Sequence, residues 1–349
     1  MTGPTDSLED LGNDGAKLRR LGFTDFEQVI QTVPVAEQAL SSYLGRPIRD
    51  ALGLPAQSFE IRSQAAAFGA SGAGNPLGAW VPLDTVARLA PLPPSPPPDQ
   101  PADQLNYIEY MPPLKDQGQR ETCVAFASVA VLEHSLRING SYKPMSEQFM
   151  YWLSKNLDGG FTQPGSRLKA AFLGLQTNGC CTADVWGYNP NRIAGDEPQP
   201  PPPSGAVYAA RAYTQSNIKR IWPTSVKAMQ AQLQARRCVA VTVPLFPSSY
   251  GTPGSARRTY TQRTGDFLNP IPGEKTIGGH AMCIVGYIDM LDQPENGYGR
   301  FIVRNSWSPT AAPPQRPWAT SPNWGLPPGY GTISYMYIRL YGAEAYSIA

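Results

Sequence analysis

The sequence predicts an α+β protein in which a helical half is followed by a half rich in strands. Helical patterns dominate from residue 122 to about 234, and short apolar β-type runs dominate from 237 onward. Before both halves, LAPLPPSPPPDQPADQ at 89–104 is a proline-rich spacer, which should be extended and semi-rigid. We therefore expect a small N-terminal helical region over 1–88, a linker over 89–104 and a main domain over 105–349.

Size and charge limit the class of function. With 349 residues, of which 41% are hydrophobic, the chain can bury a sizeable core. Its formal net charge is only +2 and it has no run of lysine or arginine, which argues against binding to nucleic acid or to an acidic membrane surface. The start, MTGPTDSLEDLGNDG, lacks the basic and apolar parts of a signal peptide, and no stretch approaches the roughly 20 apolar residues of a membrane-spanning helix. We expect a soluble protein that is cytoplasmic or is secreted without a signal peptide.

Residues 7–55 show helical spacing interrupted by glycines, which predicts a bundle of short helices. Thr24 followed by Glu27 forms a capping-box pattern that would open a helix over 26–33. The stretch LGNDGAKLRRLGF faintly resembles a helix-hairpin-helix module, but ordinary helical packing is the favoured interpretation.

A buried helix is predicted to begin at Cys123. Thr122 can cap this helix, and its apolar run continues to a stop at Asn139 and Gly140. A cysteine in the first turn of such a helix feels the positive end of the helix dipole, which lowers the pKa of the thiol and favours the reactive thiolate. Cys123 is therefore a candidate nucleophile, and the alternative is a buried structural cysteine.

The strand half contains four apolar runs and one of the two histidines of the chain. The runs are CVAVTV at 238–243, HAMCIVGY at 280–287, RFIVRNS at 300–306 and ISYMYI at 333–338. His280 begins the second run, so its ring could project from the end of a strand. Imidazole titrates in the range needed to stabilise a thiolate and later to protonate a leaving amine. His280 is thus the candidate proton partner of the thiol.

These motifs resemble those of the papain family of cysteine peptidases. Gln117 and Cys123 match its Q-G-x-x-x-x-C segment, His280 matches G-H-A-x-x-x-V-G-Y, and Asn305 with Trp307 matches N-S-W, in the order of the family. The resemblance implies an oxyanion hole formed by the Gln117 amide and the backbone N–H of Cys123. It also implies that Asn305 orients the His280 ring and that Trp307 shields their bond from water.

The resemblance extends over about residues 105–340 and is nearest to bacterial members of the family. MSEQFMYW at 145–152 matches an L-S-E-Q segment, and PGSRLKAAFLGLQTNGC at 164–180 matches a glycine-led second helix. The implied fold is papain-like and two-lobed, with a helical lobe and a strand-rich, barrel-like lobe. The residues expected to contact substrate are Glu121, Thr122, Gly165, Ser166, Gly279 and Trp307.

The sequence departs from the family pattern in three places. Arg120 occupies the position of a cysteine that forms a family disulfide, so a reducing compartment is tolerable. Glu121 and Thr122 replace a small Gly-Ser pair, which predicts a narrower, more acidic groove and a preference for basic residues near the cleaved bond. The long loop SPTAAPPQRPWATSPN between Trp307 and Trp324 could shape one rim of that groove.

The remaining histidine and cysteines have simpler interpretations. His134 lies about three turns along the helix that starts at Cys123, too far to meet the thiol, so we expect it to pack in the core. Cys238 and Cys283 lie in apolar runs and are expected to be small buried hydrophobes. The cysteines have no metal-like spacing, so no metal is expected.

The sequence therefore predicts a cysteine endopeptidase that acts on a peptide or protein substrate and needs no cofactor. The N-terminal region stands where papain-like enzymes carry an inhibitory prosegment but lacks that segment's signature, so intramolecular inhibition is a hypothesis. Two alternatives stay open. The same residues could catalyse peptide ligation or amide crosslinking, or the chain could be a catalytically silent binding module.

Overall fold

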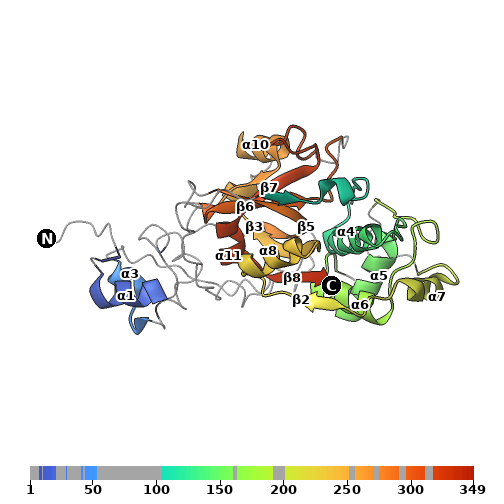
Figure 1. Ribbon diagram of the computed structural model, residues 1–349, viewed down its shortest axis with the longest axis horizontal. Helices are drawn as coiled ribbons and strands as arrows, with labels where there is room; N and C mark the ends of the chain where they lie inside the picture. Colours follow the sequence, from blue (N-terminus) through green and yellow to red (C-terminus); the bar gives the residue numbers. More distant parts are fainter. Residues whose placement is uncertain are drawn as a thin grey trace.

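The computed structural model confirms the α+β class (Figure 1). It describes residues 8–9, 11–20, 29, 41, 44–52, 104–159, 163–191, 201–250, 256–270, 275–290, 296–310 and 317–349. The helices are α1 Gly12–Arg20, α3 Ile48–Ala51, α4 Cys123–Ile138, α5 Glu147–Asp158, α6 Leu168–Thr177, α7 Ala206–Ala210, α8 Val226–Gln234, α9 Pro247–Tyr250, α10 Ala256–Thr264 and α11 Tyr335–Tyr341, with the short 3-10 helices η3 Ile108–Tyr110 and η4 Arg211–Tyr213. The strands are β1 Gln104–Asn106, β2 Ile218–Arg220, β3 Val239–Leu245, β4 Asp266–Phe267, β5 Gly278–Asp289, β6 Gly299–Arg304, β7 Tyr330–Ser334 and β8 Glu344–Ile348.

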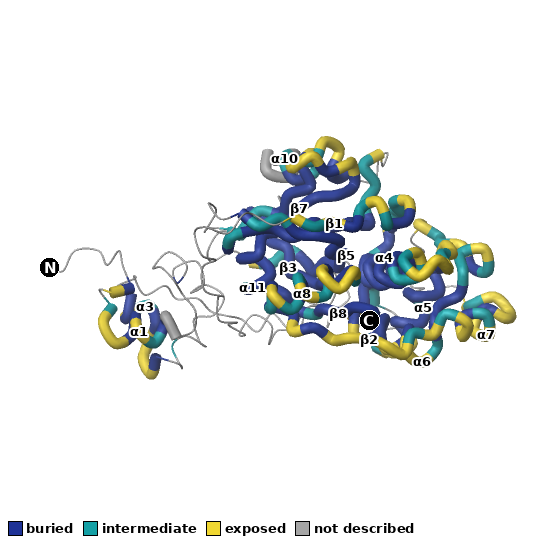
Figure 2. The backbone as a smooth tube through the Cα atoms, in the orientation of Figure 1, coloured by how far each residue is buried: buried dark blue, intermediate teal, exposed yellow. Residues whose placement is uncertain are grey.

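Helices α4 to α7 gather on one side of the main domain and the strands on the other (Figure 1). Helix α4 lies between them, and every residue from Cys123 to His134 is buried (Figure 2). Helix α5 begins where the Ser146 hydroxyl accepts a hydrogen bond from the backbone N–H of Phe149, and it ends at Gly159 with a positive φ of 73°. The two-lobed arrangement expected from the sequence is therefore present.

The strands form one sheet in the order β2-β8-β3-β5-β6-β7-β4, with β1 added beside β5. The path is open, with β2 and β4 at its ends, and every pair in it is antiparallel except β4 with β7. Strand β5 pairs with β3 along its first half, where His280 lies opposite Val243. It pairs with β6 along its second half, where Cys283 lies opposite Arg304. Because β6 ends at Arg304, the residue that follows it leaves the sheet close to the start of β5.

One predicted strand is wrong over most of its length. The run 333–338 belongs to β7 only as far as Ser334, and the chain then turns into α11. The hydroxyl of Ser334 accepts a hydrogen bond from the backbone N–H of Tyr337 and so caps the helix. A six-residue apolar run fits a buried strand or a buried helix equally well, and here the capping hydrogen bond of Ser334 favours the helix.

The described part of the N-terminal region forms most of a second apolar cluster. Its buried members are Leu8, Leu18, Val29, Leu44, Ile48, Ala51 and Leu52, and Met336 of α11 belongs to the same cluster. In Figure 1 these helices lie at the end of the molecule opposite α4 and the helical lobe. The predicted capping box at Thr24 and Glu27 and the linker up to residue 103 lie outside the described residues. No helix in the described ranges has both the length and the apolar character needed to cross a membrane.

Candidate active site

Helix α4 brings Cys123 against the start of strand β5. Cys123 is its first residue, and the sulfur accepts a hydrogen bond from the backbone of Ala281. Because Ala281 directly follows His280, the thiol lies beside the histidine-bearing end of the strand. Both Cys123 and His280 are fully buried, with 0% of their surface exposed.

The His280 ring is held from two sides. Its Nε2 atom lies 2.7 Å from Oδ1 of Asn305, which also accepts a hydrogen bond of 2.8 Å from the backbone N–H of Ser306. Trp307 stacks on the ring, with centroids 4.2 Å apart and planes inclined by 19°. Because Oδ1 acts as an acceptor, Nε2 carries the proton of a neutral imidazole. That tautomer leaves Nδ1 able to accept a proton.

Trp307 is itself packed in an aromatic layer. The Tyr250 ring lies 5.2 Å away and the Trp318 ring 6.2 Å away, between centroids. Trp318 comes from the long loop after Trp307 and is only 1% exposed. Residues 311–316 of that loop lie outside the described part of the chain. The described part of the loop therefore supports the indole that covers His280.

Gln117 lies just before α4 with both ends of its amide engaged. Its backbone N–H donates to the Ser306 carbonyl at 2.9 Å, and its Oε1 accepts a 2.5 Å hydrogen bond from the Ser306 hydroxyl. Its Nε2 donates to the Arg120 carbonyl at 2.8 Å. An amide nitrogen carries two hydrogens, so this bond uses one and orients the other. Neighbouring residues thus connect Gln117 to the segment that bears Asn305.

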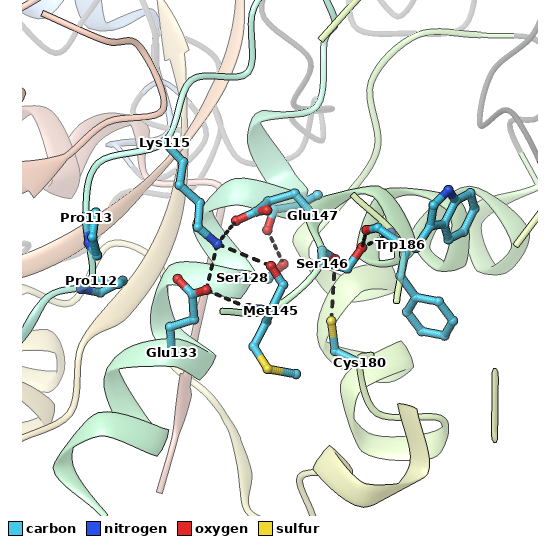
Figure 3. Close-up of polar contacts among 12 residues, drawn as sticks. Pro112, Pro113, Lys115, Ser128, Glu133, Met145, Ser146, Glu147, Cys180 and Trp186 are labelled. Carbon is cyan, nitrogen blue, oxygen red and sulfur yellow. Dashed lines mark hydrogen bonds and ion pairs between the residues drawn. The ribbon is translucent and has the colours of Figure 1, made fainter. Parts of the chain in front are cut away.

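Residues 112–122, which we call the approach segment, lead into α4 without forming a helix or strand. Side chains anchor this segment from outside. The Arg304 guanidinium donates to the carbonyls of Pro112 and Pro113. Lys115 Nζ lies 2.6 Å from both Glu133 of α4 and Glu147 of α5 (Figure 3). The position of Gln117 is therefore set by tertiary contacts.

A small cavity with both polar and apolar walls lies between the Lys115 ion cluster and Asn305. Its volume is about 10 Å³, enough for about one water molecule. Among the residues that line it are Lys115, Glu133, Glu147, Arg304, Asn305 and Ser306. Burial raises the pKa of Glu147 to about 7, although the ammonium of Lys115 acts in the opposite direction.

The predicted lowering of the Cys123 pKa is contradicted. Burial raises the pKa of this thiol to about 12, and the negative charge of Glu121 adds to the rise. Backbone hydrogen bonds from Ala281, Val124 and Cys123 itself act in the opposite direction but are weaker. The helix N-terminus stabilises the thiolate, yet desolvation of a completely buried sulfur outweighs that effect. In this conformation the neutral thiol is the stable form.

Two predicted substrate-binding hydroxyls are used inside the protein. Thr122 is fully buried, and its hydroxyl lies 2.7 Å from the Tyr188 hydroxyl; it is the residue before α4 but makes no side-chain capping bond. Ser166 is fully buried, and its hydroxyl donates to Asp158 at 2.5 Å. Both hydroxyls are therefore occupied by contacts within the protein in this conformation.

Three other residues predicted to contact substrate, Gly165, Gly279 and Glu121, lie in different parts of the structure. The Gly165 carbonyl accepts a 2.6 Å hydrogen bond from Lys155, and its backbone N–H donates to the Tyr151 hydroxyl at 3.1 Å, so Gly165 belongs to the α5–α6 connection. Gly279 is buried in β5 beside His280. Glu121 is partly exposed and lies two residues before the nucleophile candidate.

His134 lies in the core, as its sequence position predicts. It is 1% exposed and packs on the Tyr107 ring, 5.5 Å away between centroids. Burial lowers its pKa to about 4, with a further contribution from the Arg236 charge. All five cysteines are among the described residues, all are buried, and none is in a disulfide bond.

Sequence reasoning missed Tyr188 and Ser306 as parts of the site. The Tyr188 hydroxyl donates to the Gln117 carbonyl at 2.7 Å, across 71 positions of sequence. Ser306 follows Asn305 in the N-S-W motif, so its position was a usable signal. The local sequence around Tyr188 contains no motif that predicts a contact with Gln117.

Comparison with known proteins identifies the family of the chain. The model of the papain family cysteine proteases matches residues 101–312, which include all four motif residues, Gln117, Cys123, His280 and Asn305. The chain belongs to the papain family. An uncharacterized peptidase C1-like protein of Acanthamoeba polyphaga mimivirus is 25% identical over 229 residues, which cover 64% of this chain and 64% of that protein. Cathepsin K of Gallus gallus is 29% identical over 201 residues, which cover 57% of this chain and 52% of that protein.

The alignments therefore span between half and two thirds of the length of these papain-family relatives. Among solved structures, xylellain, a cysteine protease from Xylella fastidiosa, is 19% identical with a TM-score of 0.55. The match covers 78% of this chain and 90% of that one, and it shows that the fold is papain-like.

Proposed function

We propose that the chain is a cysteine endopeptidase in which Cys123 is the nucleophile and His280 its proton partner. The observation that carries the proposal is the 2.7 Å contact between His280 Nε2 and Asn305 Oδ1. The Cys123 thiol lies beside it, hydrogen-bonded to the backbone of Ala281. This contact fixes the tautomer in which Nδ1 can receive the proton of the thiol. Family membership adds independent support, because the family model is that of cysteine proteases.

The first half of the reaction transfers an acyl group to sulfur. His280 takes the thiol proton, the thiolate of Cys123 attacks the peptide carbonyl, and a carbon–sulfur bond forms. The Nε2–H of Gln117 and the backbone N–H of Cys123 stabilise the resulting oxyanion, since the first N–H groups of a helix have no acceptor within it. The carbon–nitrogen bond then breaks, and the imidazolium gives its proton to the departing amine.

The second half returns the enzyme to its starting state. His280 takes a proton from a water molecule, which attacks the thioester carbonyl. The carbon–sulfur bond breaks, a carboxylic acid leaves, and the proton on the imidazolium returns to the thiolate of Cys123. Asn305 keeps the ring in one orientation during both halves, and Trp307 keeps water away from their hydrogen bond.

The resting protein is proposed to be latent. A thiol that is fully buried and whose pKa burial raises to about 12 is a poor nucleophile near neutral pH, so a substrate has to reach and ionise it. Inhibition by the N-terminal region would account for this latent resting state. The described N-terminal residues pack with Met336 on α11, and the stretch 53–103 lies outside the described residues.

Latency is tested by comparing the full chain with a version that starts at Asp103. The shorter chain is expected to cleave peptides faster and to react faster with a thiol-directed inhibitor. Equal rates for the two proteins in both assays would refute inhibition by the N-terminal region.

The peptidase proposal is tested with a peptide library incubated with the wild type and, in parallel, with Cys123→Ala. New termini are expected only with the wild type, and sequencing the products gives the cleavage preference. An added amine distinguishes hydrolysis from ligation, because ligation shifts the product mass by that of the amine less water. Identical products from both proteins would refute the role of Cys123.

A further inference from the structure

Arg120 lies within the approach segment, three residues before Cys123, and is 1% exposed. A buried guanidinium is costly unless its N–H groups find acceptors and its plane finds a favourable surface. Its Nη1 donates to the Gln148 side-chain oxygen at 2.6 Å and to the Asn189 carbonyl at 2.9 Å. Its guanidinium carbon lies 5.2 Å from the centroid of the Tyr151 ring and 5.4 Å from that of Tyr188. Arg120 thus joins the approach segment to α5 and to the loop around residue 189.

The same arginine is connected to the proposed oxyanion donor. Its backbone carbonyl accepts the 2.8 Å hydrogen bond from Gln117 Nε2. Tyr188, which lies against the guanidinium, donates its hydroxyl to the Gln117 carbonyl at 2.7 Å. The Tyr188 hydroxyl also lies 2.7 Å from the Thr122 hydroxyl, so one ring contacts the segment on both sides of Arg120. Displacing the guanidinium would therefore disturb the Gln117 amide and the residue before the nucleophile together.

The approach segment needs such a support because it is irregular. Its turn at Gly118 has a positive φ of 63°, and a Cβ atom there would lie 2.7 Å from Pro190. No disulfide crosses this region, since none of the five cysteines is bonded to another. Near Gln117 the segment is held by hydrogen bonds to Ser306, Tyr188 and Arg120, and the backbone N–H of Gln119 donates to the Pro190 carbonyl at 3.2 Å.

We propose that Arg120 is a positioning residue, whose buried guanidinium holds the Gln117 amide in place for the oxyanion. This inference rests on the proposed peptidase function. Because the support is non-covalent, turnover should not depend on an intact disulfide anywhere in the chain. Lysine cannot substitute, since a single ammonium cannot combine the two acceptors with stacking on two rings.

The test is a double-mutant cycle between Arg120→Lys and Gln117→Ala, measured as kcat and KM on one peptide in excess reductant. Arg120→Lys is expected to lower kcat by roughly 10-fold to 100-fold, a smaller decrease than complete removal of an oxyanion donor causes. KM should stay within about twofold of the wild-type value. In the Gln117→Ala background the same change is expected to lower kcat less than about twofold, because the donor that Arg120 positions is already gone. Equal losses in both backgrounds, or an unchanged kcat, would overturn the inference.

A matched control and a second variant keep the result interpretable. Arg339 is also buried, at 6% exposure, and donates to the Gly297 carbonyl, so Arg339→Lys should cost similar stability without changing kcat. If Arg120→Lys does not fold, Gln148→Met removes an acceptor of the guanidinium, which also accepts a 3.3 Å hydrogen bond from the Asn189 backbone N–H, and is expected to give the same coupling with Gln117→Ala. A wild type with no turnover that depends on Cys123 would instead refute the peptidase proposal itself.

Discussion

The Nε2 atom of His280 lies 2.7 Å from Oδ1 of Asn305, while the ring stacks on Trp307 at a centroid distance of 4.2 Å. These two contacts leave the imidazole one orientation and one tautomer. The end of β6 at Arg304, opposite Cys283 of β5, is what brings the asparagine within reach of the histidine. Strand register therefore sets the contact between Asn305 and His280 on which the proposed proton transfer depends.

Asn305→Ala should lower kcat/KM on the order of 10²-fold, a part of what general acid–base catalysis contributes. The ring would lose its fixed tautomer, so the pH dependence of kcat should also broaden or shift. Steady-state rates from pH 5 to 9 would measure both effects. Asn191→Ala, at an exposed position, serves as the control; the orienting role is untenable if both variants behave alike.

Gln117→Ala should lower kcat by about 10²- to 10³-fold and leave KM within a few-fold, since an oxyanion donor acts mainly in the transition state. Alkylation of Cys123 by iodoacetamide forms no oxyanion, so its rate should change little. Gln119→Ala, two residues away and exposed, is the matched control. A parallel loss of turnover and alkylation would instead point to general disruption of the approach segment.

Glu121→Gln should lower the pKa of the Cys123 thiol, because the Glu121 charge is one of the causes that raise it. The pH dependence of alkylation would detect this as a shift to lower pH. The same variant should reduce the preference for arginine over glutamate in matched peptides. Exposed Glu109→Gln is the control, and an unchanged alkylation profile would remove Glu121 from the electrostatics of the site.

Two buried groups should give the unfolding free energy opposite pH slopes. Burial lowers the folded-state pKa of His134 from 6.5 to about 4, so the unfolded state binds more protons between these values and stability falls as pH decreases through them. Burial raises that of Glu147 from 4.5 to about 7, so the folded state binds more protons there and stability falls as pH increases through that window.

The wild type should therefore show partly cancelling slopes between pH 4.5 and 6.5. His134→Phe should make stability fall more steeply with rising pH, and Glu147→Gln should make it rise more steeply with pH. Urea unfolding at several pH values, compared with the wild type, measures both slopes. Parallel curves for all three proteins would contradict the assigned pKa shifts.

Local sequence signals predicted the elements that carry the site. The helix beginning at Cys123 and the strand beginning at His280 were predicted from a capping position, a stop signal and continuous apolar runs, and both are present. The run after Ile333 was ambiguous because its length suits a strand or a buried helix turn. The short strand β8 was missed because EAYSI has no longer pattern to mark it.

What the sequence could not predict depends on contacts between distant segments. Arg304 reaches the carbonyl of Pro112 across 192 positions, and Tyr188 reaches Gln117 across 71. The same limit explains the wrong direction for the Cys123 pKa. A helix dipole follows from local sequence, whereas complete burial of the sulfur depends on the tertiary packing of α4 against β5.

The central claim is that Cys123 becomes acylated during turnover. The most direct measurement is acid quenching of the protein with a rapidly acylating ester substrate, followed by mass analysis of the fragment that contains residue 123. We predict the added mass of the acyl group on Cys123 in the wild type, a much slower appearance in His280→Ala, and none in Cys123→Ala. Acylation at a different residue, or turnover that persists in Cys123→Ala, would contradict the account.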